Sequence, residues 1–154
     1  MQKIPFFPQL NEHYCGPAIL QMVLAVHTID VSQERLAQEA QTPLDMHSGT
    51  ELVHMVAVLK KYGLAVDASE HRTIAALEQA LNTDSIVIIC YTEPMEEWGH
   101  YAIVKEFRDG NIILIDPDSR TGETSLLTEE FERRWKDPLF TKSVRWAAFV
   151  SPKK

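Results

Sequence analysis

The chain has 154 residues, of which 45% are hydrophobic and 24% are charged, with a formal net charge of −7. This is the length of one domain with a single sizeable core, expected over residues 1–154, and the acidic balance argues against binding to nucleic acid or anionic membranes. No apolar run approaches the ~20 residues of a membrane span, and no secretory signal is seen. The two cysteines make no disulfide framework. We therefore expect a cytoplasmic protein without membrane insertion.

Four helices are predicted in the first half of the chain. Residues 17–27 are so densely apolar that this helix should be buried nearly all round. The third helix, residues 52–62, should end at Gly63, because glycine readily adopts the left-handed C-cap conformation. The second, third and fourth helices each follow a residue of a type that commonly caps helices, namely Ser32, Thr50 and Thr73.

Strand signals dominate the second half of the chain. The predicted strands are residues 85–91, 101–107, 111–115 and 144–150. Asp109-Gly110 is a strong hairpin signal between the second and third of these strands, and a short helix over residues 129–135 precedes the last one. Helices first and an antiparallel sheet after them predict an α+β domain with little parallel-sheet character.

Cys15 lies where a polar, turn-prone run gives way to the first apolar helix. The thiolate is the reactive form of cysteine, and a helix N-terminus favours it through unpaired N–H groups and the helix dipole. Gly16 is expected to let a substrate approach the backbone closely. A buried, inert thiol is an equally good interpretation of Cys15 taken alone. Cys90, in the middle of an apolar strand, is expected to be core packing.

Three further residues are candidate partners of Cys15. His100 opens a strand and is a candidate general base, and Asp116, at the end of the next strand, is a candidate orienting acid. Gln9 is a candidate donor to the oxyanion that acyl transfer at a thiol produces, together with the N–H of Cys15. Taken singly, each of the three is more often a structural or surface residue.

The hairpin turn decides whether His100 and Asp116 can meet. A two-residue turn with regular pairing would set Ile103 opposite Asp116, which puts the histidine and the aspartate on opposite faces. A three-residue loop with Gly110 in the left-handed conformation would pair Ala102 with Asp116 instead, and the two side chains would share a face as diagonal neighbours. A triad therefore predicts the three-residue loop or a nearby bulge.

The loop before His100, residues 92–98, carries three glutamates and one tryptophan. It is either a solvated connection or a cleft wall in which Trp98 contacts the substrate and the acids favour basic substrates. The five other histidines lack metal-ligand spacing and the chain has no glycine-rich phosphate loop, so neither a metal nor another cofactor is expected.

Three motifs together resemble a known family: Gln9-x5-Cys15-Gly16-Pro17-Ala18, then Gly99-His100-Tyr101, then Asp116-Pro117. They resemble those of the papain-like peptidases that process the double-glycine leader peptides of bacteriocins, and their free-standing relatives, and the likeness spans nearly the whole chain. The resemblance implies a papain-like fold, with N-terminal helices carrying the cysteine packed on a C-terminal antiparallel sheet carrying the histidine and aspartate. It also implies a nucleophile, a base, an orienter and an oxyanion donor at Cys15, His100, Asp116 and Gln9.

The first functional hypothesis is therefore a cysteine peptidase acting on a peptide or protein through a thioester on Cys15. A second is deamidation or acyl transfer by the same triad, which shares the first half-reaction. A third is a non-catalytic binding module on this fold, against which the four intact site residues argue. The sequence does not predict the oligomeric state.

Overall fold

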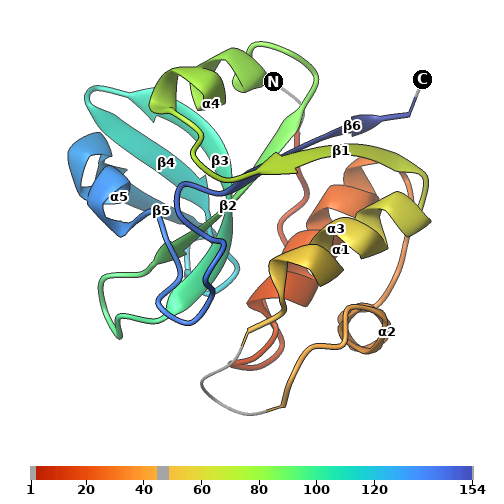
Figure 1. Cartoon of the computed structure of the whole chain (residues 1–154). Helices are drawn as coiled ribbons and strands as arrows, with labels where there is room; N and C mark the ends of the chain where they lie inside the picture. Colours follow the sequence, from red (N-terminus) through yellow and green to blue (C-terminus); the bar gives the residue numbers. More distant parts are fainter. Residues whose placement is uncertain (1–2, 45–48, 154) are drawn as a thin grey trace.

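The structure is a computed structural model that describes residues 3–44 and 49–153. Figure 1 shows a central sheet with α1, α2 and α3 on one side and α4 and α5 on the other. In chain order the elements are α1 (Cys15–Val26), α2 (Gln33–Glu39), α3 (Leu52–Lys61), β1 (Leu64–Ser69), α4 (Ile74–Leu81), β2 (Ile86–Thr92), β3 (Gly99–Arg108), β4 (Asn111–Ile115), β5 (Glu123–Leu127), α5 (Thr128–Arg134) and β6 (Ala147–Pro152).

The six strands form one sheet in the order β1-β6-β2-β3-β4-β5, and every neighbouring pair is antiparallel. The α+β class and the antiparallel sheet are confirmed, with the helix that carries Cys15 near the N-terminus. Two strands were not predicted, β1 and β5. Both lie at the edges of the sheet and alternate between exposed and half-buried residues for most of their length, so neither produces an apolar run.

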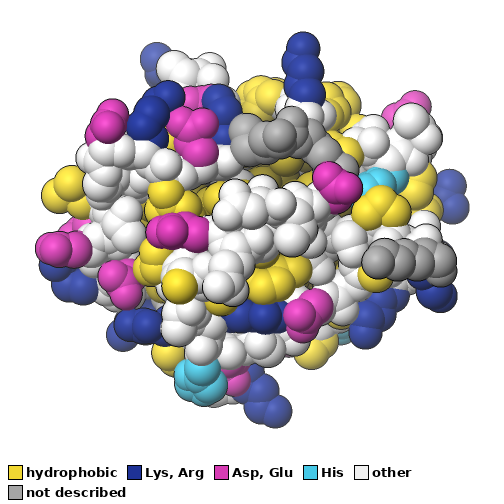
Figure 2. Space-filling model, turned by 90° about the horizontal axis from the view of Figure 1, so that it is seen from above, with side chains coloured by type: hydrophobic (Ala, Val, Ile, Leu, Met, Phe, Trp, Pro, Cys, Tyr) yellow, Lys and Arg dark blue, Asp and Glu magenta, His cyan; other side chains and the backbone are white. Residues whose placement is uncertain are grey.

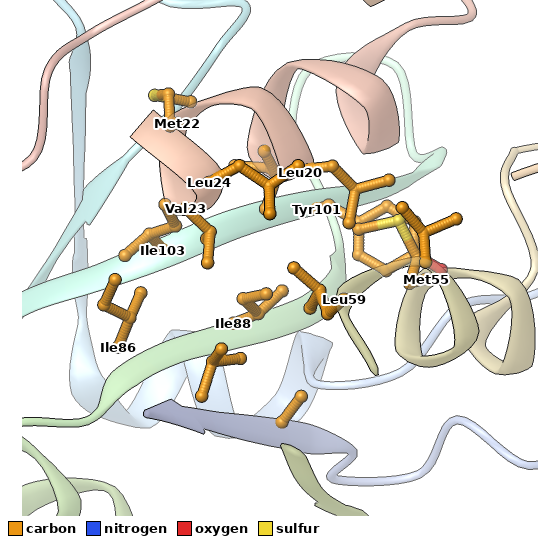
Figure 3. Packing of buried hydrophobic residues seen from close by; sticks show 14 of the residues in the cluster. Leu20, Met22, Val23, Leu24, Met55, Leu59, Ile86, Ile88, Tyr101 and Ile103 are labelled. Carbon is orange, nitrogen blue, oxygen red and sulfur yellow. The ribbon is translucent and has the colours of Figure 1, made fainter. Parts of the chain in front are cut away.

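The core forms on both faces of the sheet because side chains alternate along each strand. On β2, Ile86, Ile88 and Cys90 pack toward α1 and α3, whereas Val87, Ile89 and Tyr91 belong to the second cluster with residues of α4 and α5. Figure 3 shows the first face, where side chains of α1 and α3 meet those of β2 and β3. This packing anchors α1, the helix that begins at Cys15, on the strand that begins next to His100.

Three of the four predicted capping residues agree with the structure. Ser32 and Thr73 cap their helices by accepting N–H hydrogen bonds from Arg35 and Ala76, and Gly63 follows α3 with a φ of 88°. The prediction that Thr50 caps α3 was wrong: Glu51 occupies that position. Thr50 is instead fully buried, with its hydroxyl 2.8 Å from that of Thr42 and its carbonyl accepting from the Tyr101 hydroxyl at 2.6 Å.

The surface mixes charges of both signs. Figure 2, which views the molecule from above Figure 1, shows Lys and Arg side chains interspersed with Asp and Glu and small hydrophobic groups between them. None of the helices formed by residues 3–44 and 49–153 is long and apolar enough to cross a membrane.

Candidate active site

Cys15 is the first residue of α1 and its thiol is free. The helix therefore begins two residues earlier than the apolar pattern indicates. The N–H of a first helical residue has no partner within the helix, so the backbone at Cys15 can donate to a ligand. Cys15 is only 7% exposed, and the part that remains accessible lines a pocket shared with His100.

His100 and Asp116 form a buried pair. Nε2 of His100 lies 2.6 Å from Oδ1 of Asp116, and both side chains are about nine-tenths buried. Because Nε2 is engaged by the carboxylate, Nδ1 is the ring nitrogen left to exchange a proton with a thiol. The ring of Tyr91 packs edge-on against the imidazole, with 6.1 Å between ring centroids, and this restricts the orientation of the base.

Asp116 is itself held by two further hydrogen bonds. Its Oδ1 accepts from the backbone N–H of Asp118 at 2.9 Å, and its Oδ2 accepts from the hydroxyl of Thr124 at 2.6 Å. Thr124 lies on β5, one of the two strands that the sequence pattern does not indicate, so its contribution to the site was missed. A carboxylate with both oxygens engaged is fixed in position and orients the imidazole in turn.

The hairpin between β3 and β4 brings the pair together by a bulge. Its turn has two residues, Asp109 and Gly110, both with positive φ, so the three-residue alternative was wrong. The register shifts between Val104 and Glu106, leaving one extra residue on β3. Ile103 is consequently opposite Ile115, one position away from the Asp116 that regular pairing would give it. The second arrangement that we predicted, a bulge close to the turn, is therefore the one that occurs.

The surroundings of His100 and Asp116 favour the charged form of each side chain. Burial alone lowers the pKa of His100, but the hydrogen bonds to Asp116 and Cys15 and the charges of these two residues outweigh burial and raise it well above its usual range. Burial alone raises the pKa of Asp116, but the hydrogen bond and charge of His100 outweigh it and lower this pKa below its usual range. The site therefore stabilises an imidazolium beside a carboxylate, which is the state of a base that has accepted a proton.

Gln9 lies on the same pocket as Cys15. Its backbone N–H donates to the carbonyl of Pro117 at 2.9 Å, which ties the N-terminal segment to the loop that follows Asp116. Its side-chain Nε2 donates one hydrogen bond to the carbonyl of Asn11 at 2.9 Å, and an amide nitrogen has a second N–H to give.

The pocket has a volume of about 430 Å³. Besides Gln9, Cys15, His100 and Asp116, it is lined by Trp98 and the loop before it, by Glu12, and by residues after Asp116. Trp98 is half-buried in the wall of the pocket. The loop of residues 92–98 is a cleft wall rather than only a solvated connection.

Gly16 does not lie on the pocket. It is buried, and a Cβ added to it would come within 2.5 Å of Oγ1 and 2.8 Å of Cβ of Thr50. A substrate was expected to approach the backbone at Gly16 closely. In the structure it is Thr50 that approaches this backbone, and the contact packs α1 against the start of α3. Gly16 thus has a packing role in this structure, and its contact with a substrate stays a prediction.

Cys90 and Asp137 form a buried pair next to Gly99, the residue that precedes His100. Cys90 is fully buried, as expected, and its thiol donates to Oδ2 of the buried Asp137 at 3.7 Å. The same carboxylate packs against Gly99 so closely that a Cβ there would lie 1.7 Å from Oδ2. A side chain at position 99 would displace Asp137, and glycine is required where β3 begins. The sequence has no pattern that points to Asp137.

Among the described residues, no three histidine, cysteine, aspartate or glutamate side chains come together in a way that would hold a metal ion. His47, one of the scattered histidines, lies outside the described residues.

The fold and the site together define a class, that of papain-like cysteine peptidase domains, in which a cysteine on an N-terminal helix meets a histidine and an acid on an antiparallel sheet. The chain belongs to the peptidase C39 family, whose model matches residues 3–143.

Two similar curated proteins are bacterial transporters. The chain is 28% identical over 133 residues to the SPbeta prophage-derived sublancin-168-processing and transport ATP-binding protein SunT of Bacillus subtilis, covering 82% of this chain and 17% of SunT. It is 26% identical over 129 residues to the pediocin PA-1 transport/processing ATP-binding protein PedD of Pediococcus acidilactici, covering 82% and 17%. The chain thus spans about a sixth of the length of these relatives.

Two solved structures share the fold. The peptidase domain of Streptococcus ComA, a bifunctional ABC transporter of a quorum-sensing pathway, matches with a TM-score of 0.75 and 22% identity, over 99% of this chain and 100% of that domain. A double-glycine-motif protease from an AMS/PCAT transporter, in complex with its leader peptide, matches with a TM-score of 0.72 and 22% identity, over 99% and 94%.

Proposed function

We propose that this protein is a cysteine peptidase that cleaves a peptide or protein through a Cys15-His100-Asp116 triad. The observation that carries the proposal is the buried His100–Asp116 pair, 2.6 Å between Nε2 and Oδ1, in the wall of a pocket onto which Cys15 also opens. Membership of the peptidase C39 family supports it independently. The relatives named for leader-peptide processing support a peptide as the substrate.

In the proposed reaction, Nδ1 of His100 takes the proton of the Cys15 thiol and the thiolate attacks the scissile carbonyl carbon. The oxyanion receives hydrogen bonds from the N–H of Cys15 and from Nε2 of Gln9. The imidazolium then protonates the leaving amine, the C–N bond breaks and a thioester remains on Cys15. Water attacks the thioester with His100 as base, which releases the acid and restores the thiol.

The charge of the pocket indicates a preferred substrate. Glu12, Glu96 and Asp118 line it, and no basic side chain among residues 3–44 and 49–153 forms an ion pair with any of them. A basic side chain next to the scissile bond would supply that partner. Exposed ion pairs contribute up to about 1 kcal/mol each, so we expect a preference of up to about fivefold that weakens with added salt.

The test is cleavage of synthetic peptides that contain two consecutive glycines, followed by lysine, alanine or glutamate in otherwise identical sequences. We expect cleavage by the wild-type protein, fastest for the lysine peptide, and a loss of at least about 1,000-fold in Cys15→Ala. Mass spectrometry of the quenched reaction should find the acyl group on Cys15. Cleavage that survives in Cys15→Ala, or no cleavage and no acyl adduct with any peptide, would overturn the proposal.

A further inference from the structure

The buried side chain of Gln33 is not explained by its place in α2. Gln33 is the first residue of this helix and only 3% exposed, although glutamine is usually a surface residue. Its side-chain amide makes three hydrogen bonds, all of them to residues that precede α2. A buried amide that uses both N–H donors and its oxygen is held in one orientation.

Two of these hydrogen bonds bracket Gln9. Oε1 of Gln33 accepts from the N–H of Leu10 at 3.1 Å, and Nε2 donates to the carbonyl of Pro8 at 2.8 Å. The Gln33 side chain thus pairs with the backbone on both sides of Gln9, as a neighbouring strand would. The N–H of Gln9 itself donates to the Pro117 carbonyl, so the backbone at Gln9 is held by Gln33 and by the loop after Asp116.

The third hydrogen bond connects this segment to the helix of the nucleophile. Nε2 of Gln33 donates to Oε1 of Gln21 at 2.9 Å, and Gln21 lies on α1, which begins at Cys15. One side chain therefore joins the backbone around Gln9 to α1.

We infer that Gln33 is a positioning residue for the oxyanion hole, fixing Gln9 relative to Cys15. The inference rests on the proposed function, because it concerns the step in which the carbonyl oxygen becomes negative. The three hydrogen bonds of the Gln33 side chain go to Pro8, Leu10 and Gln21, and Gln33 does not line the pocket, so we expect it to act through Gln9. A donor contributes to the oxyanion only when it lies within about 3 Å of it, so a small displacement of the Gln9 backbone is costly.

Two variants test this role. Gln33→Glu keeps an acceptor for the Leu10 N–H but removes both N–H donors, and Gln33→Met removes all three hydrogen bonds at similar volume. The matched control is Gln38→Met, a substitution of the same kind at an exposed position of the same helix.

Two reactions of the same thiol separate positioning of Gln9 from a general structural effect. Peptide cleavage passes through an oxyanion, whereas alkylation of Cys15 by iodoacetamide displaces iodide at a saturated carbon and forms none. We expect kcat for cleavage to fall roughly 10- to 100-fold in both Gln33 variants, because removal of an oxyanion donor typically costs 100- to 1,000-fold and Gln9 is displaced rather than removed. KM and the rate of Cys15 alkylation should stay within about twofold, and Gln38→Met should match the wild type throughout.

The outcomes distinguish the inference from the proposed function. If the wild type cleaves peptides and the Gln33 variants do so equally fast, or if alkylation falls in parallel with cleavage, the inference is wrong and the proposed function stands. If the wild type cleaves no peptide, both are wrong. If the variants do not fold, hydrogen exchange of the wild type decides: the Leu10 amide should be protected relative to the exposed amide of Glu12, and equal exchange would overturn the inference.

Discussion

At the scale of single residues, the site depends on how completely Asp116 is engaged. His100, Thr124 and the backbone of Asp118 together supply three donors to its two oxygens. Three donors stabilise the charged carboxylate in a place where burial alone would favour the neutral acid. The carboxylate in turn keeps the His100 ring in one orientation, with Nδ1 available to Cys15.

This arrangement predicts how stability depends on pH. The pKa of Asp116 is lower in the folded protein than the value of about 3.9 in an unfolded chain, so near and below pH 4 the unfolded chain binds more protons. The stabilisation from Asp116 is thus present above about pH 4 and lost as the pH falls through the folded pKa. We expect Asp116→Asn to be less stable than the wild type at pH 6 by roughly 3 kcal/mol, because it leaves His100 buried without its partner.

Urea unfolding from pH 6 down to pH 2 measures this difference. The difference in the free energy of unfolding between the wild type and Asp116→Asn should become smaller as the pH falls. Asp30→Asn, at an exposed position, should stay within about 0.5 kcal/mol of the wild type. A gap that stays constant over this range would show that Asp116 does not titrate as part of the pair.

At the scale of elements, the site depends on how β3 and α1 are placed. On β3 the tight turn and the bulge act together: the turn follows from Asp109-Gly110, and the bulge moves the register by one residue before Asp116 is reached. On α1 the placement depends on contact with Thr50, which sits between α1 and α3 and also holds the Tyr101 hydroxyl of β3. Thr50 therefore connects the nucleophile's helix with the base's strand.

Gly16→Ala tests the contact between α1 and Thr50. The added Cβ would lie 2.5 Å from Oγ1 of Thr50, a fully buried side chain whose hydroxyl is hydrogen-bonded to that of Thr42. We expect a loss of roughly 1–3 kcal/mol in the free energy of unfolding, partly recovered in Gly16→Ala/Thr50→Ala. Gly49→Ala is the control, since a Cβ there meets nothing within 4 Å and its effect should be below about 0.5 kcal/mol. Equal effects of the two single substitutions would contradict the packing role.

Several elements could be predicted because local signals and burial agree. The apolar density of α1, the caps at Ser32 and Thr73, and the run of β2 all indicate their elements directly. The edge strands β1 and β5 have no such signal, because half of each strand remains accessible to water. Thr124 on β5 was missed for that reason.

The site residues differ in how far the sequence could predict them. Cys15, His100 and Asp116 could be picked out as candidates because thiol chemistry requires these residue types and each lies at the end of an element. Gln33 and Asp137 make side-chain hydrogen bonds to residues 12 or more positions away, and no local pattern indicates such contacts. The packing of Gly16 against Thr50 was not predicted, because a glycine beside a candidate nucleophile suits substrate approach and helix packing equally well.

At the scale of the whole molecule, one sheet with helices on both faces carries the two halves of the site. The N-terminal segment and α1 bring Gln9 and Cys15, and the sheet brings His100 and Asp116 (Figure 1). Three contacts join these halves near the pocket: Gln9 with Pro117, Thr50 with Tyr101, and α1 with β3 through the core. The net charge of −7 is matched by acidic side chains in the pocket, which under the proposed function would favour basic peptides over acidic ones.

We propose that Cys15 is a nucleophile activated by His100, and a comparison of the two thiols of the same chain tests this role. The folded protein is treated with iodoacetamide from pH 5 to pH 10, and the labelling rates of Cys15 and Cys90 are measured by mass spectrometry in the wild type and in His100→Asn. Cys90 is the internal control, because it is fully buried and burial raises the pKa of its thiol.

We predict that Cys15 is labelled below pH 8 at least tenfold faster than Cys90, and that His100→Asn slows Cys15 and leaves Cys90 unchanged. Labelling of Cys15 only above pH ~8, like an ordinary thiol, or at a rate no higher than that of Cys90, would show that Cys15 is not an activated nucleophile.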